Sequence, residues 1–247
     1  MSFGLLDALM WKCYSMERRT EGGGGMELAG LLKIRPGITA VIGGGGKTTL
    51  LRTLGEELAA GGKCVLLCTT TKIFPFSGLP CARTAVELER LRQEHRLLCA
   101  GTPVPDTGKL TVPETAMGEL ARRFDYVLVE ADGAAHHPLK AHAPHEPVVP
   151  PEANQVICVV GASGFGQPIA QAVHRPERYA ALAGVAEAAV ATPRTEAAVL
   201  RAENLQTSVY VNQVETLWAL TDARMLAAFL ECPVLAGSLQ RGEYFLC

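Results

Sequence analysis

Short apolar runs alternate with amphipathic segments along most of the chain. Runs such as 65–68, in which every residue is apolar, are typical of strands in a parallel sheet that is buried on both faces. Segments whose apolar residues lie three or four positions apart, such as 50–58, predict helices that cover such a sheet. We expect strands at 38–42, 63–70, 96–100, 126–129, 155–160, 208–211 and 233–236, and helices at 26–32, 47–60, 113–123, 175–184, 192–202 and 216–230, with one more short helix inside 81–101. This alternation predicts a three-layer α/β fold with a mainly parallel sheet.

The first predicted strand leads into a glycine loop and then into a helix. The loop consists of Gly43, Gly44, Gly45 and Gly46, followed by Lys47, Thr48 and Thr49. Glycines allow successive backbone N–H groups to face one concavity, and a helix start adds unpaired amides and the positive end of its dipole. A strand, a glycine loop and a helix in this order are typical of P-loop NTPases. Lys47 would then reach the β- and γ-phosphates of a nucleotide, and the Thr48 hydroxyl would bind Mg²⁺.

The glycine loop departs from the strict pattern G-x-x-x-x-G-K-[ST] at one position, because the pattern requires glycine where Val41 stands. An earlier run of four glycines, 22–25, has no apolar strand before it and no lysine after it, which is typical of a linker. We therefore expect a P-loop nucleotide-binding domain at 26–247. The peripheral extension at 1–25 is interpreted as a disordered or wrongly assigned N-terminus rather than as a docking helix.

Polar residues follow two further predicted strands, and open parallel sheets bind ligands at the carboxyl ends of their strands. Thr71 and Lys72 follow the strand at 63–70 and are expected to face the γ-phosphate and Mg²⁺, with an ordinary threonine-rich turn as the alternative. Glu130 and Asp132 follow the strand at 126–129 and, two positions apart, are expected to share a face. We assign Asp132 to the Mg²⁺ ion held by Thr48, and Glu130 to a catalytic water. Together with Lys47, these acids are the candidate catalytic residues.

A proline-rich stretch, 134–151, contains four of the six histidines: His136, His137, His142 and His145. Proline excludes a regular helix, so we predict a long ordered loop beside the nucleotide site that faces a substrate or a partner. A soft-metal site is the alternative, but adjacent histidines in such a loop have poor preset geometry. Farther along the chain, Arg175 and Arg178 are interpreted as solvated helix residues rather than as a phosphate clamp.

Composition narrows the class of protein. A chain of 247 residues with 48% hydrophobic residues is sufficient for the core of one α/β domain. A net charge of −2 does not fit a nucleic-acid partner. Eight scattered cysteines without C-x-x-C spacing predict a reducing cytoplasm rather than a disulfide framework. No apolar stretch approaches the length of a membrane span, so we expect a cytoplasmic protein without a membrane partner.

The end of the predicted strand at 208–211 carries the series Asn212, Gln213, Val214 and Glu215. It resembles the N-K-x-D base-reading motif of GTP-binding P-loop proteins, in which the acid pairs with two hydrogens of guanine. Gln213 replaces the lysine and Glu215 replaces the aspartate, so both GTP and ATP stay open. We favour GTP, because a carboxylate acceptor suits the two donors of guanine. The chain thus resembles the nucleotide-binding class that includes metallocentre-insertion GTPases.

Several segments together resemble the selenium-dependent hydroxylase accessory protein family (YqeC-like). They are 42–49, 69–72, 130–133, 138–140, 145–147 and 212–213. The block Glu-Ala-Asp-Gly, Pro-Leu-Lys and His-Glu-Pro is the most specific part, and the resemblance covers about residue 26 to the C-terminus. It implies a P-loop protein that hydrolyses a nucleotide slowly and helps to mature a molybdenum hydroxylase, with that enzyme or its cofactor as partner. His136, His137 and His142 are not part of the family pattern.

Two other functions stay open from the sequence. A small-molecule kinase or nucleotide-dependent transferase would bind its acceptor with the His/Pro-rich loop, and its nucleotide turnover would rise with that acceptor. A cofactor carrier without hydrolysis would bind its cofactor tightly even after mutation of Lys47. The topology is a further prediction: in a GTPase-like fold, the strand at 126–129 lies directly beside the strand at 38–42.

Overall fold

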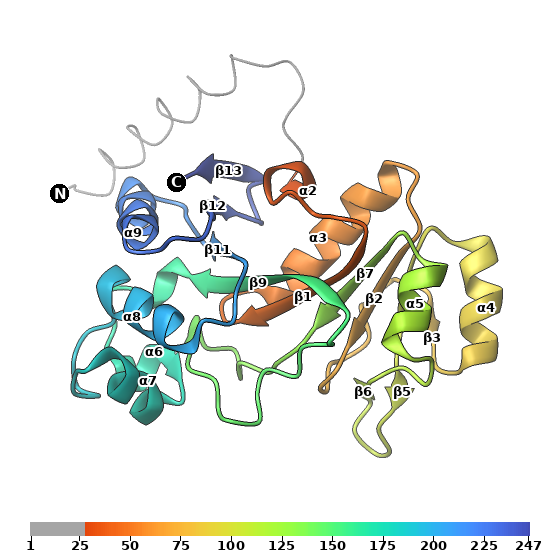
Figure 1. Cartoon of the computed structure of the whole chain (residues 1–247), viewed down its shortest axis with the longest axis horizontal. Coiled ribbons are helices and arrows are strands. Elements are labelled where there is room, and N and C mark those ends of the chain that lie inside the picture. The colour runs from red at the N-terminus through yellow and green to blue at the C-terminus, as the bar shows by residue number, and fades with distance from the viewer. Residues whose placement is uncertain (1–27) are drawn as a thin grey trace, which may run out of the picture.

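A computed structural model describes residues 28–247, and the extension at 1–25 lies outside the described residues. The main element of the described part is a nine-stranded sheet with the order β13-β12-β11-β9-β1-β7-β2-β4-β3 (Figure 1). Neighbouring strands pair in parallel, except that β13 pairs antiparallel with β12. The strands are β1 (Gly37–Gly43), β2 (Val65–Thr69), β3 (Cys81–Ala82), β4 (Leu97–Ala100), β7 (Tyr126–Glu130), β9 (Ala153–Gly161), β11 (Ser208–Asn212), β12 (Val234–Ser238) and β13 (Glu243–Leu246).

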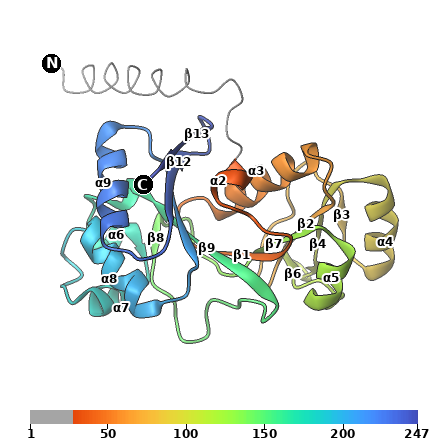
Figure 2. The same cartoon turned by 45° about the horizontal axis from the view of Figure 1, so that its top comes forward.

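Helices cover both faces of this sheet, as Figure 2 shows. One face packs against α2 (Leu28–Leu31) and α3 (Lys47–Ala60), where Leu50, Leu51 and Leu54 are fully buried. The other face packs against the remaining helices: α4 (Ala85–Glu94), α5 (Met117–Arg123), α6 (Ile169–Ala172), α7 (Pro176–Ala183), α8 (Pro193–Glu203) and α9 (Leu217–Ala228). The predicted three-layer α/β fold is confirmed. Within residues 28–247, no helix combines the length and the apolar character that crossing a membrane requires.

Strand β1 lies at the centre of the sheet, between β9 and β7. Its residue Val41 pairs with Glu130 of β7, and Glu130 pairs in turn with Thr69 of β2. The prediction that the strand at 126–129 lies directly beside the strand at 38–42 is therefore confirmed. Because these strands are parallel, their polar carboxyl ends meet at one edge of the sheet.

The structure also contains short strands that the sequence pattern did not predict. β13 returns along β12 after a turn in which Gly242 has a φ of +63°. Two small ladders lie outside the main sheet: β5 (Thr102–Pro103) with β6 (Leu110–Thr111), and β8 (Leu139–Lys140) with β10 (Val173–His174). The edge strand β3 beside β4 was not predicted either, and strands as short as β3 and the ladders show too few alternations for hydropathy to identify them.

Candidate functional site

The glycine loop between β1 and α3 has a backbone that requires glycine. Gly43, Gly45 and Gly46 have φ angles of +92°, +80° and +124°, in the left-handed region that other residues rarely adopt. At Gly44 the restriction is steric instead, since a Cβ atom would lie 2.6 Å from the carbonyl oxygen of His137. The same carbonyl accepts a hydrogen bond from the Gly45 N–H at 3.2 Å. The predicted loop is thus held in a single shape by its own backbone and by the chain around His137.

The loop ends at the start of α3, where no side chain caps the helix and Gly46 is the N-cap residue. The first N–H groups of a helix have no partner within the helix, and they carry the positive end of its dipole. Lys47 is buried, and its Nζ atom donates to the Gly43 carbonyl oxygen at 2.7 Å and lies 3.2 Å from Asp132 Oδ1. A bare helix start, a lysine and a glycine loop with left-handed backbone angles together form a site suited to a phosphate group. Thr49 is exposed in the first turn of this helix.

Glu130 is the last residue of β7 and contacts the first turn of α3. Thr48 Oγ1 donates a hydrogen bond to Glu130 Oε2 at 2.8 Å. Burial raises the pKa of Glu130, although the charge of Lys47 and the hydrogen bond from Thr48 act in the opposite direction. A hydroxyl and a carboxylate at this separation are hard oxygen donors, which are the ligands that Mg²⁺ prefers.

Asp132 lies beneath the glycine loop and is fully buried. Its Oδ2 atom accepts a hydrogen bond from the Gly43 N–H at 2.9 Å, and lies 2.7 Å from His142 Nε2 and 3.0 Å from Lys140 Nζ. Burial alone would raise the pKa of this carboxyl. The hydrogen bond with His142 and the charges of Lys47 and Lys140 outweigh that effect and lower the pKa to about 2. Asp132 is therefore ionised and surrounded by cations.

The expected arrangement of the two acids is wrong in one respect, because Glu130 and not Asp132 lies beside Thr48. The two acids would share a face only if β7 continued past Glu130, but the strand ends there. The Ala131 N–H still bonds to the Val41 carbonyl at 3.0 Å, and the chain then turns under the glycine loop. This turn places Asp132 against Lys47, so the two carboxylates face different groups.

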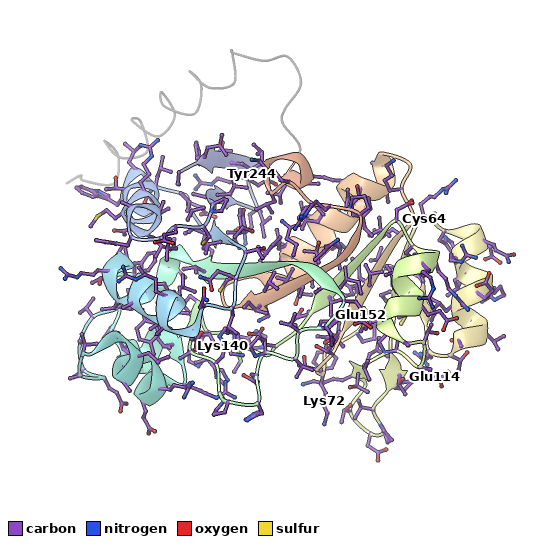
Figure 3. The ribbon with its side chains drawn as sticks, viewed as in Figure 1. Cys64, Lys72, Glu114, Lys140, Glu152 and Tyr244 are labelled. Carbon is purple, nitrogen blue, oxygen red and sulfur yellow. The ribbon has the colours of Figure 1, made fainter. Side chains whose placement is uncertain are left out.

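A buried charge network extends from Asp132 towards α8 and α7. His142 Nδ1 lies 2.6 Å from Glu203 Oε2, and this pairing together with Asp132 raises the pKa of His142 although burial lowers it. Lys140, labelled in Figure 3, is fully buried and lies 2.8 Å from Glu146 Oε2. Arg175 Nη1 donates to the same carboxylate oxygen at 2.7 Å. The interpretation of Arg175 as a solvated helix residue is therefore wrong, because it precedes α7 and pairs with Glu146.

The proline-rich loop forms a wall of the glycine loop. The Pro138 carbonyl accepts a hydrogen bond from the Gly161 N–H at 2.8 Å, next to the contact that His137 makes with Gly45. His136 and His145 are exposed. The ring of His137 stacks on the ring of His174, with 6.1 Å between the two ring centroids. Among residues 28–247, no group of three or more His, Cys, Asp or Glu side chains is arranged to hold a metal ion.

The threonines at the end of β2 contact the Glu130 backbone. Thr69 Oγ1 donates to the Glu130 carbonyl at 2.7 Å and accepts from the Thr71 N–H at 2.9 Å. Thr71 is thus linked to the Glu130 backbone through Thr69, and the expectation that Thr71 faces the γ-phosphate stays a prediction. Lys72 is exposed and lies at the lower edge of the view in Figure 3, apart from Lys140.

Asn212 joins the glycine loop to the segment that follows β12. Its Nδ2 atom donates to the Gly45 carbonyl at 2.8 Å, and its Oδ1 atom accepts from the Leu239 N–H at 3.2 Å. The side chain is nearly fully buried. Asn212 therefore fixes the relative position of two loops, and both of its polar atoms are engaged in doing so.

The two other residues of the expected base-reading series contact different neighbours. Gln213 has a left-handed backbone, with φ of +66°, and its Oε1 atom accepts from Ser163 Oγ at 2.6 Å. Glu215 accepts from Ser238 Oγ at 3.0 Å, and Arg241 Nη2 lies 3.4 Å from its other oxygen. The carboxylate of Glu215 is therefore held at the carboxyl edge by the last residue of β12 and by the segment that follows it.

Comparisons with known proteins give one family and distant structural similarities. The sequence model of the family described as "YqeC protein" matches residues 39–177. "Uncharacterized protein YqeC" from Escherichia coli (strain K12) is 36% identical over 160 residues, which make up 61% of this chain and 62% of that protein. The match thus spans less than two thirds of the length of this relative.

Two solved structures are distantly similar to the chain. Hydrogenase maturation factor HypB from Archaeoglobus fulgidus is 12% identical with a TM-score of 0.41, over 95% of this chain and 93% of that chain. The 54 kDa signal recognition particle protein from Aeropyrum pernix K1, in complex with GDP, is 17% identical with a TM-score of 0.38. The match covers 97% of this chain and 56% of that chain. Similarity at this level is too low to extend any property of those proteins to this chain.

Proposed function

The chain belongs to the YqeC family, and from this premise we propose that it binds a nucleoside triphosphate with Mg²⁺ on the glycine loop and hydrolyses it slowly. The observation that carries the proposal is the contact of Thr48 with Glu130 at the uncapped start of α3. A phosphate site, a lysine and a pair of Mg²⁺-type oxygen donors meet there within one turn of helix. Such a combination has little use in a merely structural glycine turn.

Different groups at the glycine loop would bind the phosphates and the Mg²⁺ ion of the nucleotide. Backbone N–H groups from Gly46 to Thr49 would bind phosphate oxygens, and Lys47 Nζ would neutralise their charge. Thr48 and Glu130 would hold Mg²⁺, which when bound stabilises the negative charge that phosphoryl transfer develops. Asp132, expected from the sequence to bind the metal, is proposed instead as a positioning residue that orients Lys47.

The base is proposed to be guanine, bound near Glu215 and the segment that follows β12. A carboxylate accepts hydrogen bonds from both guanine donors, whereas adenine has an acceptor nitrogen and a C–H group at the same positions. Asn212 acts indirectly, because it holds the glycine loop against this segment. Thr71 and Lys72, at the end of β2, are proposed to face the γ-phosphate side.

The proposed partner is a molybdenum hydroxylase of the selenium-dependent type, or its cofactor. The support is the family resemblance of the block from Glu130 to Pro147, which forms the wall of the glycine loop. The protein would then act as an accessory factor whose nucleotide turnover accompanies a maturation step. The exposed residues of this loop, such as His136 and His145, are available to contact the partner.

The test is ligand-induced stabilisation of the wild type, Lys47→Ala and the matched control Lys63→Ala, with Mg·GTP and Mg·ATP. Lys63 is an exposed lysine before β2, at the opposite edge of the sheet. Each variant is compared with its own ligand-free melting temperature, so a stability change caused by the substitution does not matter. A ligand at a hundred times its Kd adds about 2.7 kcal/mol to the free energy of unfolding. The ligand-induced rise in melting temperature should vanish in Lys47→Ala only. An equal rise in all three proteins would contradict the proposal.

A further inference from the structure

Two cysteines lie side by side on the last pair of strands at one edge of the sheet. Cys81 begins β3, Cys99 lies in β4, and the two residues are direct partners in the parallel register of these strands. The register is fixed on both sides, because the Cys99 N–H bonds to the Pro80 carbonyl at 2.8 Å and the Gly101 N–H to the Ala82 carbonyl at 3.1 Å. Among the described strands, no other two cysteines are paired in this way. Figure 2 shows β3 at the outer edge of the sheet, near α4.

The two side chains lie on the same face of the sheet. Both belong to the apolar cluster between the sheet and α3, in which Cys99 is buried and Cys81 is partly exposed. Neighbouring strands lie about 4.7–4.9 Å apart, so directly opposed residues fall within the Cα separation of about 4.4–6.8 Å that a disulfide spans. Because β3 is the last strand of the described sheet, its backbone can move towards β4 without breaking contacts to a further strand.

The two thiols differ in their ionisation. The hydrogen bond that Cys99 donates to the Cys81 sulfur, helped by the charge of Arg83, lowers the pKa of Cys81 to about 7, although partial burial and the charge of Glu87 act in the opposite direction. The same hydrogen bond and burial raise the pKa of Cys99. At neutral pH about half of Cys81 is therefore a thiolate, the nucleophilic form, whereas Cys99 keeps its proton. A partly exposed thiolate beside a protonated thiol is typical of cysteine pairs that react with oxidants.

We propose that Cys81 and Cys99 form a peroxide-reactive dithiol that closes reversibly to a disulfide between β3 and β4. The Cys81 thiolate attacks one oxygen of hydrogen peroxide, so that an S–O bond forms, the O–O bond breaks, and the departing hydroxide takes a proton from solvent and becomes water. The Cys99 sulfur then attacks the Cys81 sulfur, so that the S–S bond forms, the S–O bond breaks, and the hydroxyl leaves as water with the Cys99 proton. The two sulfurs together lose two electrons, which reduce one peroxide to two water molecules.

The dithiol is independent of the proposed nucleotide site. Strands β4 and β3 are separated from β1 by β7 and β2, so neither cysteine belongs to the strands that carry the glycine loop and Glu130. Cys81 directly follows the segment 70–80, which is held to α3 by a hydrogen bond from Arg52 Nη1 to the Ser77 carbonyl at 2.7 Å. A bridge to β4 would fix the other end of this segment.

The test treats the reduced full-length protein with hydrogen peroxide, alkylates the remaining thiols after denaturation, and maps the products by mass spectrometry. We expect a bridge between Cys81 and Cys99, with a loss of about 2 Da for the two hydrogens, and dithiothreitol should reverse it. Cys99→Ser keeps a hydrogen-bond donor beside Cys81 but removes the second sulfur. In this variant Cys81 should stop at the sulfenic acid, which dimedone labels. In Cys81→Ser, dimedone should not label Cys99, because this buried thiol keeps its proton.

Cys232 is the matched control within the same chain, because it is also partly exposed but burial raises its pKa. In the folded wild type at pH 7, iodoacetamide should modify Cys81 at least about fivefold faster than Cys232, since the larger thiolate fraction of Cys81 outweighs its lower intrinsic nucleophilicity. Equal rates at the two cysteines, or a peroxide-treated wild type without the bridge between Cys81 and Cys99, would overturn the proposal. Both measurements use the wild type, so they decide the proposal even if Cys99→Ser does not fold, and neither bears on nucleotide binding.

Discussion

Asp132 and Glu130 are only two positions apart, yet removing their charges should have opposite consequences for stability. Asp132→Asn takes a carboxylate away from three cationic groups, those of Lys47, Lys140 and His142. Glu130→Gln removes a carboxylate whose charged form is disfavoured by burial. We therefore expect Asp132→Asn to be strongly destabilised and Glu130→Gln to be nearly as stable as the wild type.

The magnitude for Asp132 follows from its pKa. A fall from 3.8 to about 2 corresponds to about 2.5 kcal/mol of stability at neutral pH. Because the folded-state pKa is the lower one, this contribution is present above pH 3.8 and is lost as the pH falls towards 2. The variant should lose about 3 kcal/mol or more, since it leaves buried cations without their partner.

Urea denaturation of the two variants at pH 7 measures this difference. Glu130→Gln should lie within about 1 kcal/mol of the wild type, because its raised pKa means that the charge costs stability in the folded state. The order should reverse for phosphate release, which should fall roughly 10² or more in Glu130→Gln, because a neutral amide replaces the charged carboxylate beside Thr48. Equal losses of stability in the two variants would refute the assignment of separate roles.

Three further predictions concern other groups of the site and the core. Asn212→Ala removes the link between Gly45 and Leu239, so nucleotide affinity by calorimetry should fall about tenfold while the fold is kept. The pKa of His142 is raised above 6.5, so the stability advantage of the wild type over His142→Asn should be full below pH 6.5 and shrink as the pH rises. Burial raises the pKa of Glu196 from 4.5 to about 8, so Glu196→Gln should match the wild type in urea at pH 4 and exceed it at pH 9.

The sequence predicted those parts of the site whose geometry is local. Four glycines between an apolar run and Lys47 imply a left-handed turn and a helix start, and both are present because the backbone itself requires them. The end of β2 at Thr69 was predicted to within one residue, and the parallel pairing with β7 brings it to the same edge of the sheet as Glu130. The strands of the main sheet were predicted except for β3 and β13 at its two edges, which are too short to show a period.

The charge network was not predictable from local pattern. His142 and Glu203 are 61 positions apart, and only the docking of α8 against the proline-rich loop brings them together. The sequence did hold one signal, since Lys140, His142 and Glu146 stand among prolines and alanines in a stretch that could not be a solvated helix. Charged residues in such a stretch must either be exposed or pair with one another, and spacing alone does not decide between these outcomes.

The placement of Asp132 explains why the glycine loop and the proline-rich loop are built as one unit. Of the three cationic neighbours named above, Lys47 directly follows the glycine loop, whereas Lys140 and His142 come from the proline-rich loop. If Lys47 turned towards a phosphate, Asp132 would still be paired with the other two and would stay ionised. The lysine can thus exchange one anion for another without leaving a buried charge unpaired, a step that would otherwise cost several kcal/mol. The second cation and the histidine therefore allow a buried loop lysine to change partners.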